Sequence, residues 1–167
     1  FSKNEFKRII GIPRCSIHAI PLGVSPCSYQ RVRSRPKTLK YSAPYILYVG
    51  NIKPHKNLRC LIEAYLKIKD SIPHNLVLVG KKDGFLSEDK DIVRLVSAFS
   101  DRIFLTGFVN DNVLDELYRF ATVFVFPSLY EGFGFPPLEA MARNCPTLVS
   151  SAASIPEVCG NASMYFN

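Results

Sequence analysis

Several patterns that define other classes of protein are absent from this sequence of 167 residues. No apolar run approaches the roughly 18 residues of a membrane-spanning helix, so the sequence predicts no such segment. The five cysteines are odd in number and widely spaced, and none forms a C-x-x-C pair. The three histidines complete no metal-ligand spacing. We therefore expect neither a disulfide framework nor a zinc site, and a reduced, intracellular protein.

The chain also lacks the signatures of several enzyme classes. No Ser/His/Asp or Cys/His set can be assembled from it, and no glycine-rich dinucleotide fingerprint follows the apolar segment ending at Val49. The second absence weakens a nicotinamide or flavin hypothesis. Cys60 and Cys145 lie in apolar surroundings, and we interpret both as small buried hydrophobic residues rather than reactive thiols. The chain begins without methionine and in mid-pattern, so we expect it to be a piece of a longer protein.

Acidic residues are scarce in the leading part of the chain. Residues 1–40 hold nine Lys or Arg and one Glu, a net charge of +8, whereas the remainder has a net charge of −1. We therefore separate residues 1–40, an inter-domain strand and basic linker segment, from a nearly neutral folded part over residues 41–167. The tract from Arg31 to Lys40 is either a solvated linker or a surface for nucleic acid or an anionic membrane. It has no interleaved aromatic residues, so we favour the linker and expect no nucleic-acid partner.

Segments typical of strands and helices alternate through the rest of the chain. The predicted strands are short apolar runs at Ile17–Leu22, Tyr45–Val49, Leu76–Val79, Ile103–Leu105, Val123–Phe126, Thr147–Ser150 and Met164–Phe166. The predicted helices are Ser2–Ile10, Asn57–Lys69, Glu88–Phe99, Asn112–Phe120, Pro137–Arg143 and Ile155–Cys159. This alternation predicts an α/β fold, a Rossmann-like doubly wound parallel sheet with helices on both faces. Ligands of such sheets bind at the carboxyl ends of the strands, where the glycines of this chain cluster.

The stretch over residues 126–142 combines the end of a buried strand, a glycine loop and the opening of a helix. Gly132 and Gly134 allow the backbone to approach a ligand with no Cβ in the way. Free amides at a helix start favour an anion. The sequence therefore predicts a site for an anionic ligand, flanked by the carboxylates of Glu131 and Glu139.

Charged residues near this loop each have an ordinary explanation and a functional one. Lys56 lies where a helix is predicted to begin, a position that disfavours a cation unless an anion is bound beside it; otherwise it is a surface lysine. Glu131 is either an exposed loop carboxylate or a ligand for hydroxyl groups. Glu139 is either a common first-turn glutamate or an acceptor for the diol of a sugar or ribose. The spacing of the two glutamates does not mark a hydrolase.

The segment Glu131-Gly-Phe-Gly-Phe-Pro-Pro-Leu-Glu139 resembles the E-x7-E signature of the retaining glycosyltransferases of family 4, which have the GT-B fold. Segments 17–24, 45–57, 106–111 and 154–158 are also similar to parts of that family, so the resemblance covers most of the chain. It implies the C-terminal lobe of a GT-B fold, with residues 41–167 as a truncated, nucleotide-sugar-binding Rossmann-like lobe. The acceptor site would belong to an N-terminal lobe outside this sequence.

The resemblance implies two catalytic residues, Lys56 in contact with the diphosphate and Glu131 facing the donor hexose. It implies substrate-binding roles for a larger set around them: Asn51, Lys53, Val109, Gly132, Phe133, Gly134, Phe135 and Glu139. Within this set Glu139 would hold the ribose hydroxyls, and the backbone around Val109 would meet the base. Many relatives carry a phosphate-binding arginine at the position of Asn51, and Lys53 could replace it.

No metal or other cofactor is expected, because a lysine and backbone amides can stabilise the departing diphosphate. The implied reaction transfers a hexose from a GDP- or UDP-linked donor to a glycan or lipid-linked acceptor, with retention, in polysaccharide biosynthesis. The sequence is most similar to mannosyl- or rhamnosyl-transferring relatives. We expect a cytoplasmic location, with association at the inner face of the membrane left open. The alternative function is a non-catalytic nucleotide-sugar-binding module. The fragment alone should bind nucleotide but turn over little.

Overall fold

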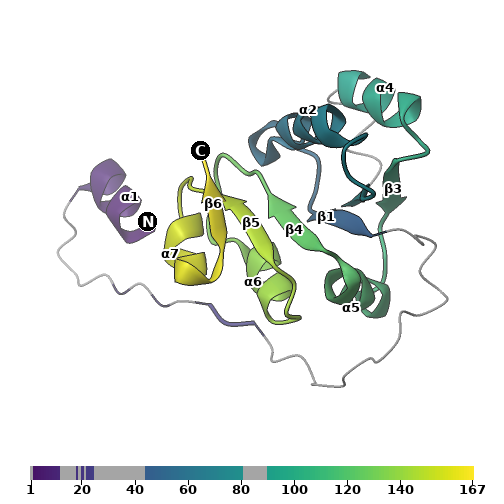
Figure 1. Ribbon diagram of the computed structural model, residues 1–167. Coiled ribbons are helices and arrows are strands. Elements are labelled where there is room, and N and C mark those ends of the chain that lie inside the picture. Colours follow the sequence, from purple (N-terminus) through teal and green to yellow (C-terminus); the bar gives the residue numbers. More distant parts are fainter. Residues whose placement is uncertain (1, 12–17, 19, 21, 25–43, 81–89) are drawn as a thin grey trace.

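The computed structural model describes residues 2–11, 18, 20, 22–24, 44–80 and 90–167, and all structural statements concern these residues. Its elements, shown in Figure 1, are α1 (Ser2–Ile10), β1 (Tyr45–Val49), η1 (Pro54–Lys56), α2 (Leu58–Ile68), β2 (Asn75–Val79), α4 (Lys90–Ala98), β3 (Ile103–Gly107), α5 (Asp111–Phe120), β4 (Val123–Phe126), α6 (Phe135–Met141), β5 (Thr147–Ser150), α7 (Ile155–Cys159), η3 (Gly160–Ala162) and β6 (Met164–Phe166). The basic tract Arg31–Lys40 lies outside the described residues. Of the predicted strand Ile17–Leu22 the structure describes only His18, Ile20 and Leu22, and none of these three is in a strand. None of the described helices is long and apolar enough to cross a bilayer.

Six strands form one parallel sheet in the order β3-β2-β1-β4-β5-β6. The chain starts at β1, adds β2 and β3 on one side, and then returns to add β4, β5 and β6 on the other. The strand order therefore reverses between β1 and β4. Loops that leave these two central strands run to opposite faces, which opens a crevice between them at the carboxyl edge. The predicted Rossmann-like fold is confirmed, and its switch point lies between β1 and β4.

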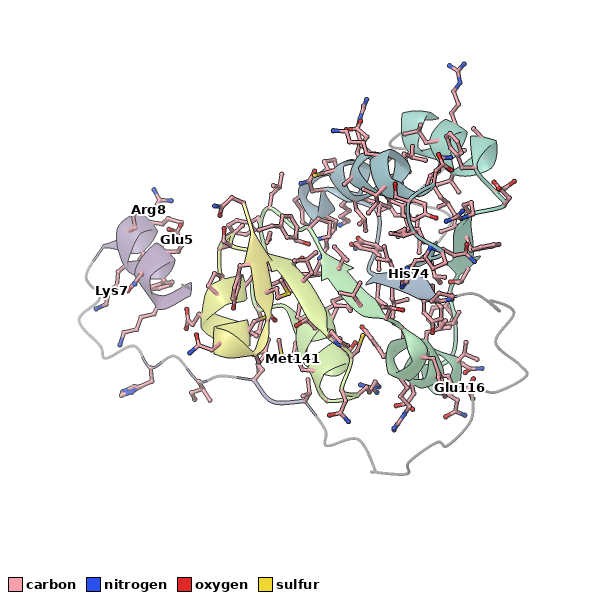
Figure 2. The ribbon with its side chains drawn as sticks, viewed as in Figure 1. Glu5, Lys7, Arg8, His74, Glu116 and Met141 are labelled. Carbon is pink, nitrogen blue, oxygen red and sulfur yellow. The ribbon has the colours of Figure 1, made fainter. Side chains whose placement is uncertain are left out.

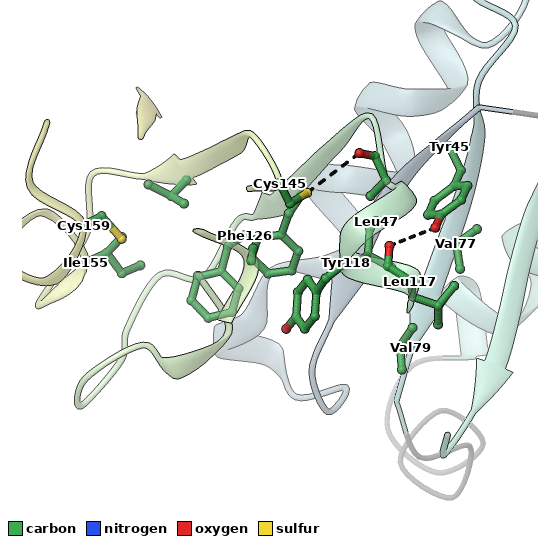
Figure 3. Packing of buried hydrophobic residues seen from close by; sticks show 14 residues of the cluster. Tyr45, Leu47, Val77, Val79, Leu117, Tyr118, Phe126, Cys145, Ile155 and Cys159 are labelled. Carbon is green, nitrogen blue, oxygen red and sulfur yellow. Dashed lines mark hydrogen bonds between the residues drawn. The ribbon is translucent and has the colours of Figure 1, made fainter. Parts of the chain in front are cut away.

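Alternate residues of the strands pack into two apolar layers, as the two-residue period of a strand requires. In β1, Tyr45 and Leu47 join a cluster with residues of α5, α6 and α7, whereas Tyr48 joins a cluster with residues of α2 and α4. Figure 2 shows the side chains that fill these layers, and Figure 3 shows the first cluster from close by. Helices thus cover both faces of the sheet, and a ligand can reach it at the carboxyl ends of the strands.

Glycines at the ends of neighbouring strands allow their backbones to touch. A Cβ on Gly80, directly after β2, would lie 2.1 Å from the carbonyl oxygen of Gly50, directly after β1. Gly50 in turn donates its amide to Val79 at 2.9 Å. A side chain at Gly80 would force the two loops apart, so this glycine sets the shape of the carboxyl edge beside the switch point.

Helix α6 begins at Phe135 and ends at Met141, two residues earlier at each end than the predicted Pro137–Arg143. The reason is Gly134, which caps the helix with φ of +107°, a conformation that side chains disfavour. Pro136 then lies in the first turn, where no amide donor is needed. Asn144, just after the helix, has φ of +56°, which an asparagine tolerates.

The interpretation of both cysteines as buried was wrong for Cys60. Cys145 is buried, and burial raises the pKa of its thiol to about 11, as expected for an inert residue. Cys60 is exposed. It follows Leu58 by two residues, about 200° around the helix, which places it away from the buried face of α2.

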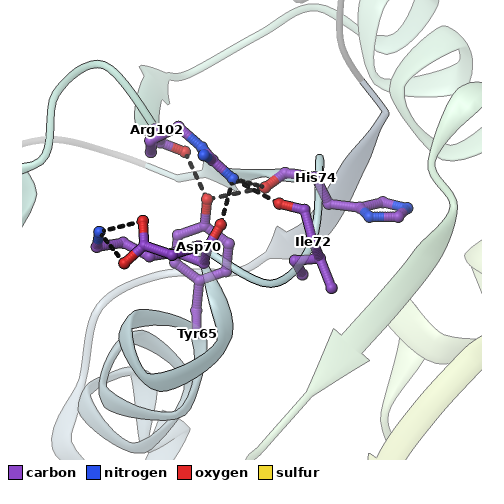
Figure 4. A network of polar contacts seen from close by, with 6 residues as sticks. Tyr65, Asp70, Ile72, His74 and Arg102 are labelled. Carbon is purple, nitrogen blue, oxygen red and sulfur yellow. Dashed lines mark hydrogen bonds and ion pairs between the residues drawn. The ribbon is translucent and has the colours of Figure 1, made fainter.

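At the amino edge of the sheet, Arg102 holds together the turn that follows α2. Its Nη2 lies 2.8 Å from the carbonyl oxygen of Lys69, 2.9 Å from that of Ile72 and 3.0 Å from that of His74. The hydroxyl of Tyr65 donates to the same His74 carbonyl at 2.9 Å (Figure 4). Each carbonyl lies outside a helix ladder, so this Arg102 cluster satisfies backbone groups that the α2–β2 connection leaves without a partner.

Candidate functional site

The loops that leave β1 and β4 meet at the switch point. The first contains η1, and the second runs from Pro127 to Gly134. The backbone amide of Leu129 donates to the carbonyl oxygen of His55 at 2.8 Å. This bond joins segments that are 74 positions apart in sequence and fixes the two loops side by side.

An ion pair forms across these loops. Nζ of Lys56 lies 2.5 Å from Oε1 of Glu131, and the two side chains are only 14% and 12% exposed. The same ammonium lies 5.5 Å from the centre of the Phe126 ring. The structure therefore brings together the two residues predicted to be catalytic. The interpretation of Glu131 as an exposed loop carboxylate is wrong, because its carboxylate is the counter-charge of Lys56.

A serine beyond β5 holds the backbone of the glycine loop. Ser154 is 3% exposed, and its Oγ lies 2.8 Å from the carbonyl oxygen of Glu131 and 3.1 Å from that of Phe133. These contacts turn both carbonyls inward, toward the serine. Ser154 was not among the predicted site residues. Its position at the carboxyl side of β5, the strand next to β4, is the signal that could have found it.

The two glycines of the loop are required for different reasons. Gly134 needs its positive φ to cap α6. Gly132 is not in that conformation, and a Cβ built on it would meet nothing within 4 Å. Protein packing therefore gives no reason for a glycine at 132, whereas close approach of a ligand would. The rings of Phe133 and Phe135 pack together with their centroids 5.1 Å apart, and the side chain of Phe135 is 40% exposed.

The side chain of Glu139 in α6 is held by a residue of the neighbouring helix α5. Its Oε2 accepts a hydrogen bond of 3.0 Å from the hydroxyl of Tyr118 in α5, and its backbone carbonyl accepts one of 3.0 Å from Nη1 of Arg143. Nε of Arg143 donates to Asp115 at 2.8 Å. Burial, and then the charge of Glu139, raise the pKa of Tyr118 far above its ordinary value, so its hydroxyl stays protonated.

An open pocket of about 280 Å³ lies over this network, lined by Gly23, Val24, Phe135, Glu139 and Arg143. The leading segment thus supplies one wall, and α6 with the residues after it supplies the other. Tyr118 and Arg143 were not predicted as site residues. Nothing in the sequence pattern distinguishes Tyr118 from the other apolar positions of α5.

The remaining predicted residues lie around the same edge without joining the network. Asn51 and Lys53 are exposed in the loop after β1, and the carbonyl of Asn51 accepts a hydrogen bond of 3.0 Å from Tyr48. Val109 is half-buried against the cluster that includes α5. Their binding roles stay predictions. Among the residues the structure describes, no group of three or more His, Cys, Asp or Glu gathers as metal ligands would, and the metal-free reaction also stays a prediction.

Together the fold and this edge define an α/β protein whose candidate ligand site, with one basic and one acidic side chain, lies at the topological switch point. The sequence model of the family "Glycosyl transferases group 1" matches residues 30–165, and the chain belongs to this family. The resemblance to glycosyltransferases inferred from the glycine loop is therefore confirmed, whereas membership of family 4 and the retaining reaction stay predictions.

Known relatives include mannosyltransferases. O-antigen chain mannosyltransferase B of Escherichia coli is 34% identical, and the match covers 98% of this chain and 45% of that protein. O-antigen chain mannosyltransferase RfbU of Salmonella typhimurium is 39% identical over 74% of this chain and 34% of its own length. The chain thus spans less than half the length of these relatives.

Solved structures share the fold. Sucrose-phosphate synthase of Thermosynechococcus elongatus aligns with a TM-score of 0.63 and 28% identity, over 74% of this chain and 32% of that one. Anabaena HepE, solved in complex with UDP and glucose, aligns with a TM-score of 0.63 and 18% identity, over 74% of this chain and 35% of its own. The expected relation to one lobe of the GT-B fold is confirmed.

Proposed function

We propose that this chain is the donor-binding lobe of a hexosyltransferase that uses a GDP- or UDP-linked sugar. The observation that carries the proposal is the Lys56–Glu131 pair at the switch point, beside a loop that Gly132 leaves open to a ligand. The acceptor is a glycan or a lipid-linked saccharide, and the anomeric configuration is retained. The mannosyltransferase relatives support mannose as the hexose and a bacterial-type polysaccharide as the product.

In the proposed reaction, the bond between C1 of the sugar and the diphosphate oxygen breaks, and C1 bonds to an acceptor hydroxyl oxygen. The proton of that hydroxyl leaves with the released nucleoside diphosphate. Negative charge grows on the diphosphate as the bond breaks, and the ammonium of Lys56 stabilises it without a metal. Lys56 is well placed for this because it is largely buried, where a charge acts more strongly than in water.

Each remaining residue has a place in this proposal. Glu131 and the amides of the loop from Gly132 to Phe135 face the hexose, and Glu139 accepts hydrogen bonds from the ribose. Asn51 and Lys53 lie near the phosphates, and the backbone at Val109 meets the base. We infer a cytoplasmic reaction, at the inner membrane face when the acceptor is lipid-linked. The odd number and wide spacing of the cysteines support this compartment.

The proposal can be tested in a chimera, because the chain aligns with nearly half of the Escherichia coli relative. The chain replaces the matching segment of that mannosyltransferase, and transfer from GDP-mannose and UDP-glucose is followed by NMR, which reports the anomeric configuration of the product. We expect transfer with retention that is lost in Lys56→Ala. Inversion would contradict the proposed mechanism. Donor binding with no transfer to any acceptor would favour the alternative, a non-catalytic nucleotide-sugar-binding module.

A further inference from the structure

The hydroxyl of Tyr118 has a single partner in the described structure, the Oε2 of Glu139 at 3.0 Å. The ring that carries it is fully buried within the cluster of Figure 3. It packs edge-on against Phe124, with ring centroids 5.5 Å apart and planes at 62°. The guanidinium of Arg143 lies over the same ring at 5.4 Å. The ring therefore cannot swing away, and its hydroxyl points at one fixed place.

Glu139 is consequently held at two points. Tyr118 binds one carboxylate oxygen, and Arg143 binds the backbone carbonyl of the same residue at 3.0 Å. Within the described part of the chain, the other oxygen, Oε1, accepts no hydrogen bond. Glu139 also lines the open pocket with Gly23 and Val24. Oε2 is thus bonded to the protein, while Oε1 can accept a hydrogen bond from a ligand in the pocket.

We propose that Tyr118 is a positioning residue that fixes the carboxylate of Glu139 for a ribose diol and so makes the site select ribonucleotides over deoxyribonucleotides. This inference rests on the proposed function, in which Glu139 holds the ribose. A glutamate without such an anchor has three rotatable bonds to order when a ligand binds, which costs affinity. With Tyr118 in place, the side chain of Glu139 is already ordered in the free protein, so this cost is not incurred on binding.

The chemistry of a buried tyrosine suits this role. Burial and the neighbouring carboxylate keep its hydroxyl protonated, so it acts toward Glu139 as a donor alone. If Glu139 turned away, the hydroxyl would be left buried and unpaired, which is unfavourable. The pair therefore keeps one geometry. Arg143, itself held by Asp115, supports the same glutamate through its backbone.

The experiment compares Tyr118→Phe with Tyr65→Phe in the full chain. Tyr65 is a matched control, since it is also buried and its hydroxyl donates to a backbone carbonyl at the far edge of the sheet. Calorimetry measures the dissociation constants of GDP and UDP and of their 2′-deoxy and 3′-deoxy forms, with Glu139→Ala in the same series. Thermal melting confirms that each variant is folded.

We expect the unmodified chain to prefer the ribonucleotide by about tenfold, the value of one hydrogen bond to a charged group. Tyr118→Phe should weaken ribonucleotide binding about fivefold and weaken deoxynucleotide binding less than twofold, so that the preference falls from about tenfold to about two- to fourfold. Tyr65→Phe should leave the preference unchanged even though it lowers the melting temperature. That combination would support the positioning role.

Other outcomes overturn the inference in distinguishable ways. Equal losses for ribo- and deoxynucleotides in Tyr118→Phe would show a general structural effect. An unchanged preference in Tyr118→Phe, together with its loss in Glu139→Ala, would remove Tyr118 from the site and leave the ribose assignment intact. An unchanged preference in Glu139→Ala would contradict the ribose assignment itself, and the role of Tyr118 with it.

Discussion

Two half-buried polar clusters lie at opposite edges of the sheet, and the partners of their cations differ. At the amino edge, Arg102 binds three backbone carbonyls, those of Lys69, Ile72 and His74 (Figure 4). At the carboxyl edge, Lys56 binds the side chain of Glu131, which comes from another loop. The positions of backbone carbonyls are fixed by the fold, so Arg102 has a structural role. A carboxylate on a loop can be exchanged for a phosphate, so Lys56 remains available to a ligand.

The comparison shows how burial and charge alone can mislead. Both clusters are charged, partly buried and assembled from distant segments. None of these three properties distinguishes a structural cluster from a ligand-binding one. What separates them is the chemistry of the partner and the place in the fold. Only the Lys56–Glu131 pair lies where the strand order reverses, the edge at which sheets of this kind bind ligands.

The largest expected effect comes from removing Arg102, the cation of the structural cluster. Arg102→Ala removes the donor of the Lys69 and Ile72 carbonyls, leaves that of His74 to the Tyr65 hydroxyl alone, and should lower the free energy of unfolding by about 3 kcal/mol. Where the variant is folded, its affinity for GDP or UDP should stay within twofold. Urea unfolding and calorimetry measure the two quantities. The control is Arg59→Ala, which removes an exposed pair with Glu63 and should cost about 0.5 kcal/mol or less. A loss of nucleotide affinity in folded Arg102→Ala would contradict the division between the clusters.

Removing Lys56 tests the other side. Lys56→Ala deletes the cation proposed to face the diphosphate and should weaken binding of GDP or UDP about 10- to 100-fold, the range for hydrogen bonds to charged groups. Lys67→Ala, which removes an exposed lysine of α2, is the control for net charge and should have no effect. Equal affinities for the two variants, measured by calorimetry, would take Lys56 out of the site.

A smaller effect of opposite sign is expected at Glu131. The diphosphate must displace its carboxylate from Lys56, so Glu131→Gln should bind the free nucleoside diphosphate at least about threefold more tightly, since the pair is largely buried and its attraction is screened less than that of a surface pair. Transfer of the sugar should nevertheless fall, because the amide no longer carries the charge that faces the hexose. Calorimetry with the nucleotide and the chimera assay separate the two effects. Weaker nucleotide binding would show that Glu131 supports Lys56 rather than competing for it.

A separate effect, one of pH on stability, is expected on the face of the sheet that carries α6. Burial raises the pKa of Cys145 to about 11 from an ordinary value near 9, so above pH 9 the unfolded chain releases a proton that the folded chain keeps. The free energy of unfolding should therefore fall as pH rises from about 9 to 11. The raised pKa values of Tyr48 and Tyr118 act in the same direction. Urea unfolding across this range should show a shallower decline in Cys145→Ala; an identical slope would exclude this thiol as a cause.

Much of the fold follows from local pattern. Unbroken apolar runs such as Tyr45–Val49 identify strands buried on both faces, and the helix spacing of Leu58, Leu61 and Tyr65 identifies α2. The order of the strands needs more than pattern, but regular alternation leaves few alternatives. Errors arose where one backbone angle decides, as at Gly134, which starts α6 earlier than the prolines suggest.

The site was predicted as far as its residues carry a local signature. Glycines, loop carboxylates and a lysine near a helix start are visible in sequence, and the structure brings Lys56 and Glu131 together. Tyr118 and Ser154 carry no such local signature, and Ser154 could have been found only from the strand order, which places β5 beside β4. Their roles depend on which strands are neighbours and on side chains that meet across helices, and no spacing along the chain encodes either.

The central claim is that the carboxyl edge between β1 and β4, and not the Arg102 cluster, binds the nucleotide diphosphate. Amide hydrogen exchange of the full chain, with and without saturating GDP or UDP, tests both edges in one measurement. The account predicts slower exchange at residues 51–57 and 128–135 and no change at residues 69–75. Protection at residues 69–75, or none at the two loops of the switch point while the nucleotide is bound, would contradict it.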